Sequence, residues 1–274
     1  MNNSFEPYQE KYTAQEITER LNILLQDKSL FTFFDITPHN LTIKNKNQEP
    51  FLSIRLREDA LPKPIFKPRR IAIDAGHSGG PLEDPIECKF IYDANKKRKL
   101  EEQEINLYTA TILKKLLEQN GIEVLLTRTK PYELVSNADH YNRNIELAAR
   151  AKKINDFKPD LTFVIHYNLT PFDHTVDPTY TEWTEKNYSM VFIAGAYENN
   201  LFLDHPDFFL KRLLSHDLTH SEQISQKIIS LLEKNLSIPP VAFNEETAPY
   251  LQKFSCETKY QGVFSRGLSL LQNV

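Results

Sequence analysis

The sequence predicts an α/β fold, a mostly parallel sheet with helices on both faces, preceded by a small α+β unit at the N-terminus. Two observations lead to this prediction. From residue 71 onward, short apolar runs alternate with longer stretches of helical apolar spacing, which is typical of a parallel sheet covered by helices. The first sixty residues follow another order, with one helical stretch and then three β-leaning runs.

The N-terminal unit is expected over residues 1–60. Thr13 and Glu16 have the spacing of a capping box, and an apolar stripe follows them, so a helix is expected over residues 13–26. The predicted strands are residues 30–36, 41–44 and 51–56. Because about sixty residues make a marginal domain, we expect this unit to rest on the larger one.

Residues 61–70 carry three prolines among basic residues and predict a stiff linker. The main domain is then expected over residues 71–274. Its predicted elements are, in order, strand 71–75, helix 102–118, strand 122–127, helix 142–155, strand 161–166, strand 189–194, helix 221–236 and strand 268–272, with an apolar helix candidate at 206–214. Alternation of this kind places successive strands parallel to one another.

Composition excludes several classes of function. A net charge of −4, from 33 basic and 37 acidic residues, gives no broad attraction to nucleic acid or to an anionic membrane. Only Cys88 and Cys256 are present, which excludes a disulfide framework and a thiolate-rich zinc site, while one disulfide between them stays open. No apolar stretch approaches the length of a membrane span, and residues 1–10 do not resemble a signal peptide.

Glycine is concentrated at one strand end. Three of the seven glycines lie in Gly76-His77-Ser78-Gly79-Gly80, directly after the first strand of the main domain. A second histidine, His166, ends the similar run that begins at Asp160. Because carboxyl ends of parallel strands share one edge of a sheet, two histidines there indicate a metal site. A catalytic zinc takes three protein ligands, and Glu102, in the first turn of the helix 102–118, is the best candidate for the third.

Five segments resemble one enzyme family in order and spacing, the zinc-dependent N-acetylmuramoyl-L-alanine amidases (amidase type 3), which cleave bacterial peptidoglycan. The matching segments are Ile73 to Gly80, Glu102 to Leu107, Leu125 to Arg128, Arg150 with Ile154-Asn155, and Asp160 to Asn168. The resemblance covers roughly residues 69–274 and implies zinc held by His77, Glu102 and His166. It also implies hydrolysis of the amide between N-acetylmuramic acid and L-alanine, and a periplasmic or secreted protein that acts on the cell wall.

The same resemblance leaves the general base unassigned. In the family, a glutamate on a late strand follows an Arg-Gly-Leu segment, which Arg266-Gly267-Leu268 matches here, and Val274 comes six residues later. Glu245, Glu246 and Glu257 lie upstream at positions that the family pattern does not support. The sequence therefore leaves two hypotheses open: an amidase whose domain is cut short, or a zinc-binding peptidoglycan binder or regulator that lacks the base.

Other residues have weaker functional interpretations. Some family members cover the zinc with a helical insertion that a partner displaces, so residues 197–220 are either such a lid, open to an activator protein, or the surface helix that we favour. His216 and His220 are spaced for a helical metal pair but lack the glutamate of a zinc protease motif. Arg128 and Arg150 are expected to hold carboxylates or carbonyls. Asp74 either orients His77 or caps the loop.

Overall fold

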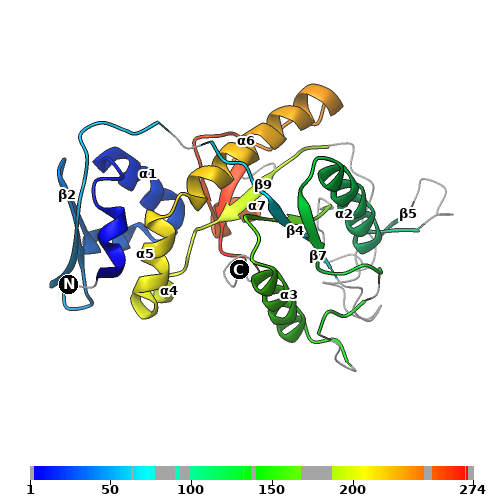
Figure 1. Ribbon diagram of the computed structural model, residues 1–274, viewed down its shortest axis with the longest axis horizontal. Helices are drawn as coiled ribbons and strands as arrows, with labels where there is room; N and C mark the ends of the chain where they lie inside the picture. Colours follow the sequence, from blue (N-terminus) through cyan, green and yellow to red (C-terminus); the bar gives the residue numbers. More distant parts are fainter. Residues whose placement is uncertain are drawn as a thin grey trace. The chain divides into compact units, whose positions relative to one another are not determined.

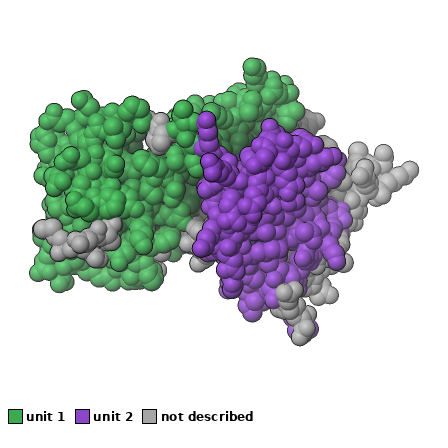
Figure 2. Space-filling view, in the orientation of Figure 1, with its two compact units in different colours: residues 1–66, 187–268 green, residues 67–186, 269–274 purple. Residues whose placement is uncertain are grey.

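A computed structural model describes residues 3–62, 65–77, 90–92, 99–131, 133–136, 140–167, 187–243, 249–268 and 270. The chain divides into two compact units (Figure 2). Unit 1 combines residues 1–66 with residues 187–268, and unit 2 comprises residues 67–186 and 269–274. Among the described residues, no helix has both the length and the apolar character that crossing a bilayer requires.

The first part of unit 1 is the predicted α+β segment. Its elements are η1 (Asn3–Tyr8), α1 (Ala14–Leu24), η2 (Lys28–Phe33), β1 (Phe34–Ile36), β2 (Asn40–Lys44) and β3 (Pro50–Arg55), and the strands form an antiparallel sheet in the order β1-β2-β3. The predicted capping box is confirmed, because Thr13 and Glu16 exchange hydrogen bonds at the start of α1. The predicted strand 30–36 is wrong over its first half. Asp27 accepts a hydrogen bond from the Ser29 amide and begins a 3-10 helix there instead.

The second part of unit 1 follows residue 187. It contains β9 (Val191–Ala194), α4 (Asn199–Asp204), α5 (Pro206–Leu214), α6 (Asp217–Leu236), α7 (Pro249–Phe254), β10 (Ser255–Glu257) and β11 (Val263–Arg266). The sheet order is β10-β11-β9, and β9 and β11 are parallel. The predicted strand 268–272 is wrong at its start, since Leu268 follows the strand β11 rather than opening one; residues 271–274 lie outside the described part. Gly262, with φ of 76°, lies in the turn directly before β11.

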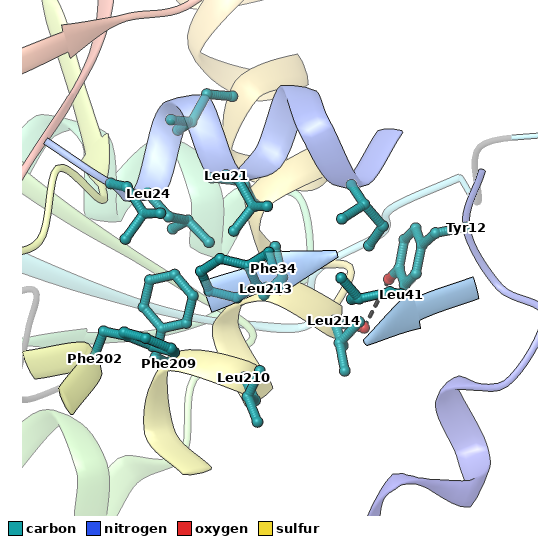
Figure 3. Packing of buried hydrophobic residues seen from close by; sticks show 14 of the residues in the cluster. Tyr12, Leu21, Leu24, Phe34, Leu41, Phe202, Phe209, Leu210, Leu213 and Leu214 are labelled. Carbon is teal, nitrogen blue, oxygen red and sulfur yellow. Dashed lines mark hydrogen bonds between the residues drawn. The ribbon is translucent and has the colours of Figure 1, made fainter. Parts of the chain in front are cut away.

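One apolar core joins the two parts of unit 1. Helices α1 and α5 lie side by side and bury Leu21, Leu24, Phe209 and Leu213 together with Phe34 of β1 (Figures 1 and 3). The Tyr12 hydroxyl donates a hydrogen bond of 2.7 Å to the Leu214 carbonyl at the end of α5. Residues 1–60 thus share their core with residues 187–268, in line with the expectation that this small unit rests on a later part of the chain. The domain bounds 1–60 and 71–274, with a linker at 61–70, stay a prediction.

Unit 2 holds a parallel three-stranded sheet of β4 (Arg70–Ala75), β7 (Glu123–Leu126) and β8 (Leu161–Ile165), in the order β7-β4-β8. Helix α2 (Glu102–Gln119) packs on Ile71, Ile73 and Ala75, whereas α3 (Arg143–Phe157) packs on Ala72. Because successive residues of a strand point to opposite faces, the two helices cover opposite faces of the sheet. The predicted α/β class is confirmed. A short antiparallel pair, β5 (Phe90–Tyr92) and β6 (Lys99–Glu101), precedes α2 and was not predicted.

Candidate metal centre

The three residues expected to bind zinc come from three elements of unit 2. His77 lies two residues beyond the end of β4, Glu102 is the first residue of α2, and His166 directly follows β8. The Gly76 amide donates to the Ile165 carbonyl at 2.9 Å, which continues the pairing of β4 and β8 past the last strand residues. His77 then takes φ of 56°, a left-handed conformation that is uncommon outside glycine and typical of functional turns. The sheet therefore brings both histidines to one edge, beside the first turn of α2.

The side chains of these residues converge. One ligand atom from each of His77, Glu102 and His166 lies within 4.8 Å of the others, and this is the one such group of three among the described residues. Glu102 Oε1 is 3.2 Å from His77 Nε2 and 3.1 Å from His166 Nδ1. The Glu102 side chain is 1% exposed and the His166 side chain is 40% exposed, so the group is closed on the helix side and open at His166.

Gly76 makes room for this arrangement. A β-carbon at residue 76 would lie 2.3 Å from Cε1 and Nε2 of the His166 ring, a distance that real contacts do not reach. The two imidazole rings are 4.8 Å apart between centroids and nearly perpendicular, at 87°. The glycine that the sequence places before His77 thus has a specific task, since any side chain there would displace the second histidine.

The surroundings of Glu102 favour its ionised form. Burial by itself raises the pKa of Glu102, but hydrogen bonds from His166 and His77 and their charges outweigh that effect and hold the pKa well below the ordinary range. The Tyr167 amide also donates to Glu102 Oε1, at 3.2 Å. A carboxylate that stays charged while buried is a suitable metal ligand, because binding does not require it to lose a proton.

Behind the site lies a buried polar network. The Asp74 carboxylate accepts hydrogen bonds from Thr127 Oγ1 and, at 3.2 Å, from Arg150 Nη1. Arg150 Nε also donates to Glu146 at 3.1 Å, and the Glu146 carboxylate accepts from two backbone amides, Val135 and Ser136. Arg150 thus holds carboxylates as predicted. The Asp74 carboxylate binds Thr127 and Arg150, and neither of its two expected roles, orienting His77 or capping the loop, is seen among the described residues.

Arg128 holds only carbonyl oxygens, which was the other expectation for the two arginines. Arg128 lies two residues after the end of β7 and is fully buried. It donates hydrogen bonds to backbone carbonyls around the site, including those of Ala75, Gly76 and Gln103. Burial, together with repulsion from Arg150, lowers the pKa of Arg128 to about 10, so the guanidinium is still charged at neutral pH.

Sequence reasoning missed Gln103 and Asn106. Both are buried in α2, and Asn106 Nδ2 donates to the Gly76 carbonyl at 2.9 Å. The signal was present in the spacing, because Asn106 lies one helical turn after Glu102 and shares its face. A polar residue on the buried face of an amphipathic helix indicates a specific partner.

His216 and His220 do not join the group of His77, Glu102 and His166. His216 and His220 have ring centroids 6.0 Å apart, and their neighbours are aromatic: His216 packs near Tyr12 and His220 stacks on Phe66 at 4.4 Å. These contacts indicate packing within unit 1.

The remaining candidates from the sequence include the two cysteines. Cys256 is a buried free thiol in unit 1, which gives no support to a disulfide with Cys88. Cys88, Ser78 to Gly80, Asn168, His174, Glu245 and Glu246 lie outside the described residues. Glu257 is an exposed residue of β10.

Comparisons with known proteins identify the family. The family model described as N-acetylmuramoyl-L-alanine amidase matches residues 71–241, a range that contains all three converging residues. A search of the curated proteins finds no match.

Solved structures also show similarity. Cwp6 from Clostridium difficile is 26% identical with a TM-score of 0.28, over 37% of this chain and 13% of that chain. The CwlD amidase from Clostridioides difficile, solved in complex with the GerS lipoprotein, is 19% identical with a TM-score of 0.40, over 72% of this chain and 80% of that one. The family assignment rests on the family model. This chain belongs to the N-acetylmuramoyl-L-alanine amidase family.

Proposed function

We propose that this chain is a zinc-dependent peptidoglycan amidase that hydrolyses the amide bond between N-acetylmuramic acid and L-alanine, with His77, Glu102 and His166 as the zinc ligands. One observation carries the proposal: a family of amide hydrolases is matched, and within the matched range two imidazoles and one carboxylate meet at a sheet edge. In such enzymes three protein ligands leave the fourth position of zinc open.

The donor set fits zinc. Imidazole nitrogens and carboxylate oxygens bind zinc at about 2.0–2.2 Å, so a tetrahedral site places neighbouring ligand atoms about 3.3–3.6 Å apart. The separations of 3.1 and 3.2 Å between Glu102 Oε1 and the two histidine nitrogens need only a small adjustment, and the whole set of ligand atoms, which spans up to 4.8 Å, would have to draw closer around the ion. The buried carboxylate supplies one negative charge, which favours a divalent cation over a neutral ligand.

Zinc bound here would acidify a water molecule and polarise the scissile carbonyl. The residues of the chain contribute position and charge. Glu102 is fixed by the first turn of α2, and His166 rests against Gly76, so neither ligand has to be reoriented. Because His166 is the exposed member of the group, the substrate would approach from its side. The proton acceptor is not assigned to any described residue, since Glu102 is the one carboxylate in the group.

The experiment combines metal analysis with product analysis. Purified full-length protein is analysed for zinc and then incubated with peptidoglycan, and the products are identified by mass spectrometry of muropeptides. We expect one zinc per chain, loss of most of it in His77→Ala and His166→Ala, and release of stem peptides that begin with L-alanine. His205→Ala, an exposed histidine of unit 1, is the matched control and should keep its zinc.

The outcomes test the ligand set, the catalytic activity and the substrate separately. Unchanged zinc in both His→Ala variants would reject the ligand set. One zinc per chain without amide cleavage would favour the second hypothesis, a zinc-binding peptidoglycan binder or regulator without a general base. Cleavage at another bond would reject the substrate assignment.

Location and partners follow from the proposed substrate. A peptidoglycan amidase acts in the cell envelope, in the periplasm or as a secreted protein. The proposal includes an activator that acts on residues 197–220, but only part of this segment is accessible to it. Phe209, Leu210 and Leu213 of α5 are already buried in the core of unit 1, so an activator would have to bind the opposite face of that helix.

A further inference from the structure

All the hydrogen-bond donors of Arg128 are used, and all on backbone carbonyls. Nε donates to Ala75 at 3.0 Å, Nη1 to Lys130 at 3.1 Å and Pro131 at 3.2 Å, and Nη2 to Gly76 at 3.1 Å and Gln103 at 2.8 Å. A guanidinium has five N–H groups in a fixed planar fork, so this side chain is saturated. Its side chain is fully buried, and a buried cation is tolerated only when its donors are satisfied in this way.

Two of these carbonyls belong to residues beside the proposed zinc ligands. Gly76 directly precedes His77, and Gln103 directly follows Glu102. One nitrogen, Nη2, binds both carbonyls, so a single planar group spans the turn after β4 and the first turn of α2. Asn106 strengthens the same link, because its Nδ2 donates to the Gly76 carbonyl at 2.9 Å.

We propose that Arg128 is a positioning residue that fixes the separation of His77 and Glu102 by tying the Gly76 and Gln103 carbonyls together. The inference rests on the proposed function, since it takes these two residues as metal ligands. A purely structural role would also bury the side chain, but it would not require that its bonds connect the two ligand-bearing elements.

Lysine cannot replace this geometry. Its ammonium group is a compact charge with three donors, and it cannot reach five carbonyls that are arranged around a planar fork. Arg128→Lys therefore keeps the positive charge but loses the simultaneous bonds to Gly76 and Gln103. Loss of groups that orient metal ligands typically lowers metal affinity about 10-fold to 100-fold.

The test uses the full chain. Zinc affinity is measured by competition with a chelator, and the visible spectrum of the cobalt(II)-substituted protein reports the geometry of the ligands. We expect Arg128→Lys to bind zinc about 10-fold to 100-fold more weakly than the wild type and to show shifted or weakened cobalt bands. Wild-type affinity together with a wild-type cobalt spectrum in a folded Arg128→Lys protein would overturn the inference.

Arg150→Lys is the matched control. Arg150 is also buried, but it binds the carboxylates of Asp74 and Glu146, with a longer bond of 3.4 Å to the Ala75 carbonyl, in the network behind the site. The Arg150→Lys variant should have a lower stability than the wild type and an unchanged cobalt spectrum. If both variants shift the spectrum equally, general loosening of unit 2 explains the effect and the specific role of Arg128 is rejected.

A second variant keeps the test decisive if Arg128→Lys does not fold. Asn106→Ala removes one of the two bonds to the Gly76 carbonyl without disturbing a buried charge. It should weaken zinc binding several-fold and alter the cobalt bands, and unchanged values would overturn the inference. A wild-type protein that binds neither metal would instead reject the proposed function, and this inference with it.

Discussion

Different kinds of interaction dominate the interiors of the two units. Unit 1 is organised around one large apolar core, to which α1, the β1-β2-β3 sheet, α5 and α6 all contribute. Unit 2 has smaller apolar clusters on the two faces of its sheet, together with a set of buried polar residues. These polar residues are Asp74, Glu102, Gln103, Asn106, Thr127, Arg128, Glu146 and Arg150.

The two kinds of interaction affect different properties, the stability of the fold and the positions of single side chains. Apolar burial is non-directional and scales with area, so a core like that of unit 1 stabilises a fold without fixing single atoms. Hydrogen bonds to carbonyls and carboxylates are directional, and buried networks of them fix one arrangement. Unit 1 also buries polar residues, such as Arg20 and Glu222, but the residues that could bind a metal lie in unit 2, within its polar network. We infer that changes in unit 1 alter stability, whereas changes to network residues that bind the ligand-bearing segments, such as Arg128 and Asn106, alter the site.

The largest expected effect on stability comes from the core of unit 1. Leu21 in α1 is fully buried, and Leu21→Ala should destabilise unit 1 by about 2–5 kcal/mol because it leaves a cavity beside α5. Hydrogen exchange of the α1 and α5 amides measures the loss. The exposed neighbour Asn22→Ala is the control. The zinc affinity of Leu21→Ala should stay at the wild-type value. A tenfold change would contradict the inference that the core of unit 1 affects stability without affecting the site.

The next effect concerns the site itself. Gly76→Ala should lower zinc affinity about 10-fold to 100-fold, because the added methyl group would overlap the His166 ring. Chelator competition measures the affinity. Gly121→Ala, also in unit 2, provides the control: its φ of 78° makes the substitution strained, but no atom lies within 4 Å of the new methyl group. Equal zinc affinities in the two variants would show that His166 does not depend on Gly76.

A smaller effect is expected at the start of α1. Thr13→Ala removes the hydrogen bond that the Glu16 amide donates to Thr13 Oγ1 and should cost about 1 kcal/mol. Thr18→Ala in the same helix is exposed and should change stability by no more than about 0.5 kcal/mol. Urea denaturation of both variants checks this order, and a larger loss in Thr18→Ala would contradict the role of the cap.

The smallest effect is a pH dependence in unit 1. Burial, together with His216 and Arg20, lowers the pKa of His220, while Asp217 acts in the opposite direction. A depressed folded-state pKa means that the unfolded chain binds more protons, so the contribution is complete above about pH 6.5 and is lost as the pH falls through the folded pKa. Denaturation midpoints from pH 8 to pH 5 should therefore fall more in the wild type than in His220→Gln. Parallel curves would remove His220 as the cause, and His205→Gln serves as the exposed control.

Local sequence signals determined much of the fold. The capping box at Thr13 placed α1, the apolar spacing after Glu102 placed α2, and the proline at residue 206 opens α5 where the pattern predicted a helix. The same signals brought His77, Glu102 and His166 to one edge, because strand ends and a first helical turn are local features. Periodicity and caps act within a few residues, so a single sequence contains them.

The tertiary structure alone decided what these elements pack against. An apolar stripe on α1 shows which face is buried, but only the fold shows that α5, nearly two hundred residues later, covers it. Strand β11 lies at Val263–Arg266 because it pairs with β9, and the local pattern had favoured a later segment. Arg128 is the clearest case, since its acceptors lie on β4, on α2 and in its own turn. Apolar burial and hydrogen bonding between distant residues depend on spatial proximity, which the order of residues along the chain does not contain.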